Sequence, residues 1–247
     1  MNVITKNIPN SITCLNLLAG FASLIFGADP FAMHGSMAGW QWAVLFIGVA
    51  AVADFADGFM ARLLGAYSEL GKQLDSLSDN VSFGVAPAFL MFNIFRNYPG
   101  VPEWMAWVCL IIPVCGALRL ARFNIDTRQS EEFIGLPIPA NAIFWIGYAA
   151  CVASSLGSSA AFGESSGVYI WSGMLTLPAV AVPIIIIEAL LMVCNMRMFS
   201  LKFKTFGWKR NGRRWIILIA SAVLLRCFGL PAFSLIIILY LLLSIKN

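Results

Sequence analysis

Long apolar runs recur along the whole chain and are separated by short polar connectors. A membrane-spanning helix needs about 20 predominantly apolar residues, and most of the runs approach that length. They predict about eight transmembrane helices, over Ser11 to Gly27, Trp40 to Leu64, Leu74 to Phe95, Trp104 to Leu120, Leu136 to Leu156, Tyr169 to Cys194, Trp215 to Phe228 and Pro231 to Ile245. The last two runs are short, so a re-entrant hairpin, or one kinked unit around Gly229, Leu230 and Pro231, is an alternative. We therefore expect an all-α integral membrane protein, a polytopic helical bundle.

The composition excludes a water-soluble globule. Of the 247 residues, 60% are hydrophobic and only 11% are charged, whereas soluble domains carry about 25% charged residues. The six cysteines lie in or beside apolar runs without a CxxC spacing, which is typical of small buried side chains. His34 is the single histidine in the sequence. A histidine-based zinc site and a Ser-His-Asp triad are therefore both disfavoured.

The basic residues lie mostly on one side of the predicted membrane. The net charge is +4, and of all the Lys and Arg residues only Arg96 and Arg226 fall in connectors of the opposite side. The positive-inside rule then predicts that both termini lie in the cytoplasm. The basic run from Lys202 to Arg214 suits anionic lipid headgroups better than nucleic acid. We expect a multi-pass protein of the cytoplasmic membrane that binds membrane lipids and no nucleic acid.

Four acids interrupt apolar segments where hydropathy favours none. Asp54 and Asp57 lie in the second predicted helix, and Asp75 and Asp79 lie at the start of the third. Each Asp near the centre of a spanning helix costs about 2.5 to 3.5 kcal/mol, so some interaction must offset that cost. Spacings of three and four residues place each pair on one helix face. Because the connector is short, the two helices are expected to be antiparallel neighbours, with all four carboxylates near their cytoplasmic ends.

Four carboxylates with few matching cations make a hard, oxygen-rich site. Such a site suits Mg²⁺, Mn²⁺ or Ca²⁺ rather than zinc. Gly58 and Ala61 follow Asp54 and Asp57 by one helical turn and leave space for a ligand. Arg62 adds a cation that can bind phosphate oxygens. These features favour a site for a metal and a phosphate group.

Two other interpretations of the acids remain open. The four carboxylates could pair helices, with Gly58 and Ala61 as small packing residues. They could also line an ion or proton pathway, as in a divalent-cation transporter. A transporter needs a polar path to the opposite face, and apart from Glu188 the outer halves of the predicted helices offer little. Glu188 itself has no evident partner.

The acids and their neighbours form one pattern, Asp54-x-x-Asp57-Gly58-x-x-Ala61-Arg62, eight residues, and Gly71-x-x-x-Asp75-x-x-x-Asp79. This pattern resembles the complete signature of the CDP-alcohol phosphotransferase family and departs from it nowhere. The resemblance implies an integral, usually dimeric protein with a core of six helices. It also implies transfer of a phosphatidyl or related phosphoryl group from a CDP-linked donor to an alcohol, with release of CMP.

The resemblance assigns roles to individual residues. It implies that Asp54, Asp57, Asp75 and Asp79 bind divalent metal, Mg²⁺ or Mn²⁺, and that Asp79 is also the catalytic base that activates the acceptor hydroxyl. The residues that it implies for binding the CDP-linked lipid are Asn10, Thr13, Asp57, Gly58, Ala61, Arg62, Gly71 and Asp75.

Further stretches resemble one branch of the family, the membrane phosphatidylserine synthases of bacteria and archaea. They are Asn7 to Asn16 with Gly20, Leu118 to Asn124, Phe133 to Ala140 and, more weakly, Met192 to Ser200. The resemblance implies CDP-diacylglycerol and L-serine as substrates. It places Arg119, Arg122 and Asn124 at the serine site. Glycerol 3-phosphate, inositol phosphate and choline remain alternative acceptors.

The resemblance also divides the chain into two parts. Residues 1–200 correspond to the membrane domain of the family and would contain the active site on the cytoplasmic face. Residues 201–247 would form a basic cytoplasmic connector and two additional C-terminal membrane helices. By the same resemblance, we expect the protein to be a homodimer.

Overall fold

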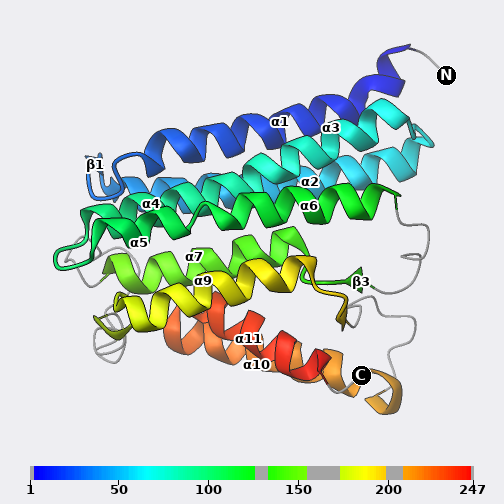
Figure 1. Ribbon diagram of the computed structural model, residues 1–247. Coiled ribbons are helices and arrows are strands. Elements are labelled where there is room, and N and C mark those ends of the chain that lie inside the picture. Colours follow the sequence, from blue (N-terminus) through cyan, green and yellow to red (C-terminus); the bar gives the residue numbers. More distant parts are fainter. Residues whose placement is uncertain (1–2, 126–132, 155–172, 199–207, 246–247) are drawn as a thin grey trace.

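The computed structural model describes residues 3–125, 133–154, 173–198 and 208–245. These residues fold almost entirely into helices that run alongside one another, with both ends of the chain at the same end of the bundle (Figure 1). The helices are α1 Val3–Gly27, α2 Gly39–Leu64, α3 Glu69–Asp79, α4 Ala86–Asn97, α5 Glu103–Val108, α6 Ile111–Ile125, α7 Ile138–Ser154, α9 Pro178–Val193, α10 Trp208–Phe228 and α11 Ala232–Ser244. The expected all-α class is confirmed.

Each of the eight predicted spans corresponds to helical structure in the described residues. Two spans contain more than one helix, because α3 continues through a π-helical segment into α4, and α5 is followed directly by α6. Asn7–Gly27, Gly39–Leu64 and Glu103–Ile125 are long and apolar enough to cross a membrane. Ile138–Ser154, Pro178–Val193 and Ala232–Ser244 are shorter apolar helices. The protein is a membrane protein, and the full number of crossings stays a prediction.

The third span is interrupted by a π-helical segment, Asn80–Val85, that begins directly after Asp79. Ala86 donates its backbone N–H to the carbonyl of Val81, five residues earlier. Pro87 follows and has no N–H to donate, so a regular α-helical hydrogen bond is missing at this point. A wider turn accommodates the missing bond, and π-turns of this kind are frequent at functional sites.

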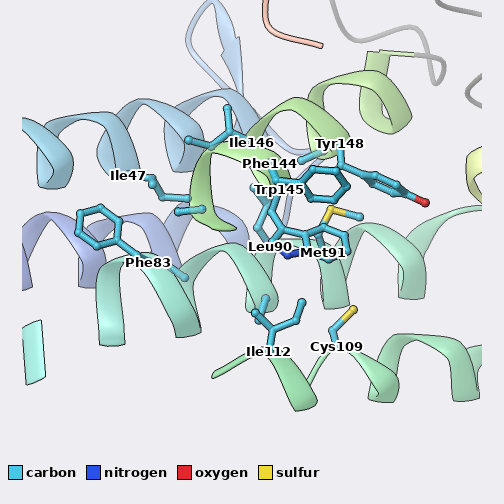
Figure 2. Close-up of a cluster of buried hydrophobic side chains, with 14 of the residues drawn as sticks. Ile47, Phe83, Leu90, Met91, Cys109, Ile112, Phe144, Trp145, Ile146 and Tyr148 are labelled. Carbon is cyan, nitrogen blue, oxygen red and sulfur yellow. The ribbon is translucent and has the colours of Figure 1, made fainter. Parts of the chain in front are cut away.

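The apolar core lies in the middle of the bundle, where side chains from several helices pack together. Its largest fully buried side chains come from α2, the π-helical segment, α4, α6 and α7, and Figure 2 shows several of them packed together. They include Ile47, Phe83, Leu90, Met91, Ile112 and Trp145. Trp145 donates its indole N–H to Asn141, whose amide in turn donates to the carbonyl of Phe83. The polar groups in this core are therefore tied to one another and hold α7 against the third span.

The last two helices form a hairpin, and whether it spans the membrane or is re-entrant stays a prediction. α10 and α11 pack against each other, and the chain turns at Gly229, whose φ of 61° suits glycine. α11 also packs along α7, where Ser234 Oγ donates to the carbonyl of Phe144 at 2.7 Å. α10 starts at Trp208, earlier than the expected Trp215, and most of the basic connector before it lies outside the described residues.

Two short strand pairs close the ends of the bundle. Met33–His34 (β1) and Met37–Ala38 (β2) form a hairpin between α1 and α2. Phe133–Ile134 (β3) pairs antiparallel with Arg197–Met198 (β4), so the segment before α7 lies beside the segment after α9. Sequence periodicity predicts neither pair, because each strand has only two residues.

The contact between α7 and α11 depends on a glycine. A Cβ atom at Gly147 would lie 2.6 Å from Ser234 Oγ and even closer to the Ser234 backbone nitrogen. We expect Gly147→Ala to destabilise the protein by about 1–3 kcal/mol through overpacking, seen as a lower thermal unfolding midpoint of the purified protein in detergent. Gly48→Ala is the control, because a Cβ there meets nothing within 4 Å. Equal unfolding midpoints for the two variants would contradict the expected role of this contact.

Candidate active site

Three of the four membrane acids converge where α2 meets α3. One carboxylate oxygen each from Asp54, Asp57 and Asp75 lies within 4.8 Å of the others. Asp57 is buried, and Asp54 and Asp75 are half-buried. α3 begins at Glu69, where the side chain of Ser68 accepts a hydrogen bond from the Gly71 N–H and caps the helix. α3 therefore begins before Asp75, and Asp75 lies opposite Asp54 and Asp57 of α2.

Asp79 belongs to the same region but is not one of the three clustered acids. It is buried and interacts electrostatically with Asp54, Asp57 and Asp75. Its Oδ1 accepts a hydrogen bond from the side-chain amide of Asn16 at 3.1 Å. Asp79 therefore has one carboxylate oxygen held by α1 and lies beside the cluster.

Helix α1 forms the third wall of the site. Thr13 and Asn16 lie one turn apart on α1, and each hydrogen-bonds a different acid. Thr13 Oγ1 donates to Asp57 Oδ2 at 2.6 Å. The backbone carbonyl of Asn16 also accepts a hydrogen bond from Ser82 Oγ in the π-helical segment at 3.0 Å. Two polar side chains of α1 thus each donate one hydrogen bond to an acid of the site.

The remaining residues of the predicted donor site lie around the same acids. A Cβ atom at Gly58 would be 3.7 Å from an Arg62 guanidinium nitrogen, so the Arg62 side chain lies over the Gly58 backbone. A Cβ at Gly71 would be 2.8 Å from Asn10 Oδ1, which brings α1 and α3 close together. Ala61 is half-buried on α2. Small residues therefore let side chains and backbone approach closely around the acids.

The structure separates the three residues predicted for the serine site. Arg119 is buried and interacts electrostatically with Asp79. Arg122 is exposed and donates to the carbonyl of Val193 at the end of α9. Asn124 donates to Ser76 Oγ, and its own carbonyl accepts from Lys72, so it ties α6 to α3. Arg119 alone of the three is placed beside the base expected from the sequence.

Asn16 is the site residue that sequence reasoning missed. It is fully buried; its side-chain amide donates to Asp79, and its backbone carbonyl accepts from Ser82 in the π-helical segment. A signal for it exists in the sequence, because Thr13 and Asn16 put two polar side chains three residues apart in an apolar run. That signal does not identify the acids as their partners, because Thr13 and Asp57 are 44 residues apart along the chain and Asn16 and Asp79 are 63 residues apart.

The clustered acids fit a hard divalent cation. All of the donor atoms are carboxylate oxygens, which Mg²⁺ and Mn²⁺ prefer. Asp75 Oδ1 is buried and has no hydrogen-bond partner among the residues that the structure describes. An unpaired buried carboxylate oxygen is costly unless a cation or a donor meets it. The cluster can therefore hold a metal ion, and its chemistry does not distinguish Mg²⁺ from Mn²⁺.

Comparison with known proteins agrees with this geometry. The model of the family described as CDP-alcohol phosphatidyltransferase matches residues 6–178. The chain belongs to this family. The matched range contains the entire acid signature, the polar residues of α1 and Arg119, whereas α10 and α11 lie beyond it. The resemblance noted in the sequence is thus confirmed.

Several relatives bear the same name, CDP-diacylglycerol–serine O-phosphatidyltransferase. The protein from Mycobacterium leprae is 41% identical over 147 residues, which is 57% of this chain and 45% of that protein. The one from Methanocaldococcus jannaschii is 35% identical over 149 residues, 60% of this chain and 63% of its own length. The one from Bacillus subtilis is 37% identical over 131 residues, 53% of this chain and 70% of its own length. The similarity thus spans between about half and two thirds of these proteins.

The acid cluster predicts metal binding that can be measured directly. We expect the purified protein to bind Mn²⁺, as followed by electron paramagnetic resonance. Asp75→Asn removes one ligand, and even indirect partners of a ligand contribute about 10–100-fold to affinity, so we expect the affinity to fall at least tenfold. Asp29→Asn is the control, because Asp29 is exposed beyond the far end of α1. Unchanged Mn²⁺ affinity in Asp75→Asn would contradict this assignment.

Proposed function

We propose that the chain is a metal-dependent enzyme that transfers the phosphatidyl group of CDP-diacylglycerol to the hydroxyl of L-serine, with phosphatidylserine and CMP as products. The arrangement of Asp79 beside the three clustered acids carries this proposal, because it unites a divalent-metal site with a candidate base. Family membership supports the transfer reaction. The names of these relatives specify serine, which supports serine as the acceptor.

The donor side of the reaction uses α1, α2 and α3. Asp54, Asp57 and Asp75 would hold the metal, with Asp79 adjacent, and a bound Mg²⁺ or Mn²⁺ would supply positive charge against the donor diphosphate. Arg62 binds diphosphate oxygens through its guanidinium group. Asn10, Gly58, Ala61 and Gly71 surround the CDP moiety, where small residues allow a close approach of the backbone.

The acceptor side of the reaction centres on Asp79. Its carboxylate accepts the proton of the serine hydroxyl as that oxygen attacks the β-phosphorus of the donor. A bond forms between the serine oxygen and the β-phosphorus, and the bond from that phosphorus to the oxygen bridging to the α-phosphate breaks. CMP leaves with that oxygen, and no covalent enzyme intermediate is needed. The hydrogen bond from Asn16 keeps the Asp79 carboxylate in one orientation.

The same proposal includes the setting of the enzyme. Both termini and the active site face the cytoplasm, because the basic connectors lie on that side. The donor then reaches the acids from the cytoplasmic leaflet while its acyl chains stay in the lipid. Residues 1–200 act as the catalytic membrane domain, residues 201–247 as an addition to it, and the enzyme is a homodimer in the cytoplasmic membrane.

An acceptor panel tests the reaction and its substrate together. The purified protein in detergent receives CDP-diacylglycerol and Mn²⁺ or Mg²⁺, and CMP release is followed with L-serine, glycerol 3-phosphate, inositol phosphate, choline or no acceptor. We expect release that requires both serine and metal. Release with another acceptor alone would keep the transfer reaction and reject serine. No release with any acceptor would reject the enzyme and favour divalent-cation transport.

The contact between Asn16 and Asp79 predicts coupled effects on turnover. We expect Asp79→Asn to lower kcat by about 10²-fold or more, because general base catalysis contributes about 10²–10⁴-fold, while CDP-lipid binding is retained. Asn16→Leu should lower kcat less, and it should add little to the effect of Asp79→Asn, because residues that act through one another are not additive.

Ser23→Ala is the control for losing a buried polar atom on α1, since Ser23 is buried two turns beyond Asn16. It should leave kcat unchanged. Multiplicative losses in the Asn16/Asp79 double variant would show that Asn16 does not act through Asp79. Near-normal turnover of Asp79→Asn would remove Asp79 from the role of base.

A further inference from the structure

A proline leaves one backbone carbonyl of the π-helical segment without its usual helical donor. In an α-helix the N–H of residue 87 would bond the carbonyl of Phe83, four residues earlier, but Pro87 has no N–H. Phe83 is fully buried, and a buried carbonyl that lacks a donor is destabilising. This carbonyl therefore calls for a donor from another part of the chain.

Asn141 on α7 supplies that donor. Its Nδ2 donates to the carbonyl of Phe83 at 3.2 Å, and its Oδ1 accepts the indole N–H of Trp145 at 3.0 Å. An indole N–H can only donate, so the second bond fixes which end of the amide faces the carbonyl. Asn141 is fully buried, and Trp145 packs in the core near Leu90 (Figure 2). The amide of Asn141 is therefore held in one orientation against the π-helical segment.

The π-helical segment connects this hydrogen bond to the candidate base. Asp79 comes directly before the segment, and Ser82 lies within it. Both side chains bond Asn16 of α1, since Asp79 accepts from its side-chain amide and Ser82 donates to its backbone carbonyl. The path of the backbone between residues 79 and 83 thus sets where Asp79 lies relative to Asn16.

The wider turn also sets the direction in which Asp79 faces. A π-helical hydrogen bond spans five residues and an α-helical one spans four, and one residue corresponds to about 100° of helical rotation. Conversion of the π-turn into an α-turn would therefore rotate α3 relative to α4. α4 is held by Leu90 and Met91 in the core (Figure 2). α3 is held by the hydrogen bond from Asn124 to Ser76. The change would fall between these fixed points, at Asp79.

We propose that Asn141 is a positioning residue of the transfer reaction. By bonding the carbonyl of Phe83 it stabilises the π-turn, and the π-turn orients Asp79 toward the acceptor hydroxyl. The proposal rests on the proposed function and deepens it, because it assigns to α7 a part in catalysis that acts through the backbone of the third span. The Asn141→Leu substitution suits an apolar helix but removes the donor to this carbonyl.

This role predicts a loss of turnover without a loss of metal binding. Asp54 and Asp57 belong to α2, and Asp75 is next to Ser76, which Asn124 holds. The metal cluster should therefore survive the loss of the Asn141 amide. A residue that only stabilised the bundle would behave differently, since its replacement would lower the folded fraction and reduce metal binding and turnover together.

The test compares Asn141→Leu with wild-type protein in detergent, by serine-dependent CMP release and by Mn²⁺ titration followed by electron paramagnetic resonance. A displacement of about 1 Å can cost about 10²-fold in rate, so we expect kcat to fall by about 10- to 10²-fold. The KM for CDP-diacylglycerol and the affinity for Mn²⁺ should stay close to those of wild type. Where Asn141→Leu does not fold, Asn141→Ala, which adds no atoms to the core, takes its place with the same expected result.

Two second-site variants test the route of the effect. In the Asp79→Asn background, Asn141→Leu should lower kcat little further, because residues that act through one another are not additive. Pro87→Ala restores an N–H four residues after Phe83, so in that background too Asn141→Leu should change kcat less than in wild type. Full, multiplicative losses in both backgrounds would show that Asn141 acts neither through Asp79 nor through the carbonyl of Phe83, and would overturn the proposal.

Asn93→Leu is the matched control. Asn93 is also a buried asparagine, and its Nδ2 donates to the backbone carbonyl of Phe89 on α4, away from Asp79. It should keep the wild-type kcat. If Asn141→Leu lowers kcat no more than Asn93→Leu does, or lowers kcat and Mn²⁺ affinity together, the positioning role is rejected and the proposed function stands. Wild-type protein that releases no CMP would reject both.

Discussion

The structure depends on burying several carboxylates inside an apolar bundle. Asp54, Asp57, Asp75 and Asp79 need partners, because an Asp in a membrane helix is costly when nothing compensates it. α1 supplies two of the partners, since Thr13 donates to Asp57 and Asn16 donates to Asp79. The oxygens that these bonds do not satisfy, such as Asp75 Oδ1, are those that a cation is suited to meet. The carboxylate oxygens that lack a protein partner are unfavourable for folding, and the same oxygens are available to bind a metal ion.

Local backbone features serve the same arrangement. The cap at Ser68 starts α3 early enough to set Asp75 against α2, and the π-helical segment begins at the residue after Asp79. The wider turn carries Ser82, whose hydroxyl bonds the Asn16 backbone and so locks α1 to the third span. Small residues allow these approaches, because the neighbouring atoms leave no room for a Cβ atom at Gly20 or Gly71. Backbone and side-chain contacts therefore both define the site.

In the proposed reaction the two substrates meet different parts of the bundle. The donor is bound by α1, α2 and α3, which carry the family signature. Of the residues expected at the acceptor site, Arg119 on α6 is the one that interacts with Asp79. α11 lies beyond the matched family range and packs against α7.

The sequence by itself determined the fold class, the approximate positions of the spans and the family. Apolar runs and the spacing of acids are local properties, and hydropathy makes them strong in a membrane protein. The convergence of Asp54, Asp57 and Asp75 was also predictable, because a short connector forces α2 and α3 to be neighbours.

Only the tertiary structure decided which other residues join these acids. Arg119 and Arg122 are three residues apart and look equivalent in the sequence, yet one is buried near Asp79 and the other is exposed and bonds the end of α9. Asn16 is far from the signature along the chain. Its position follows from how α1 packs against the rest of the bundle. Periodicity along one helix states which face is polar, but it does not state which distant helix that face will meet.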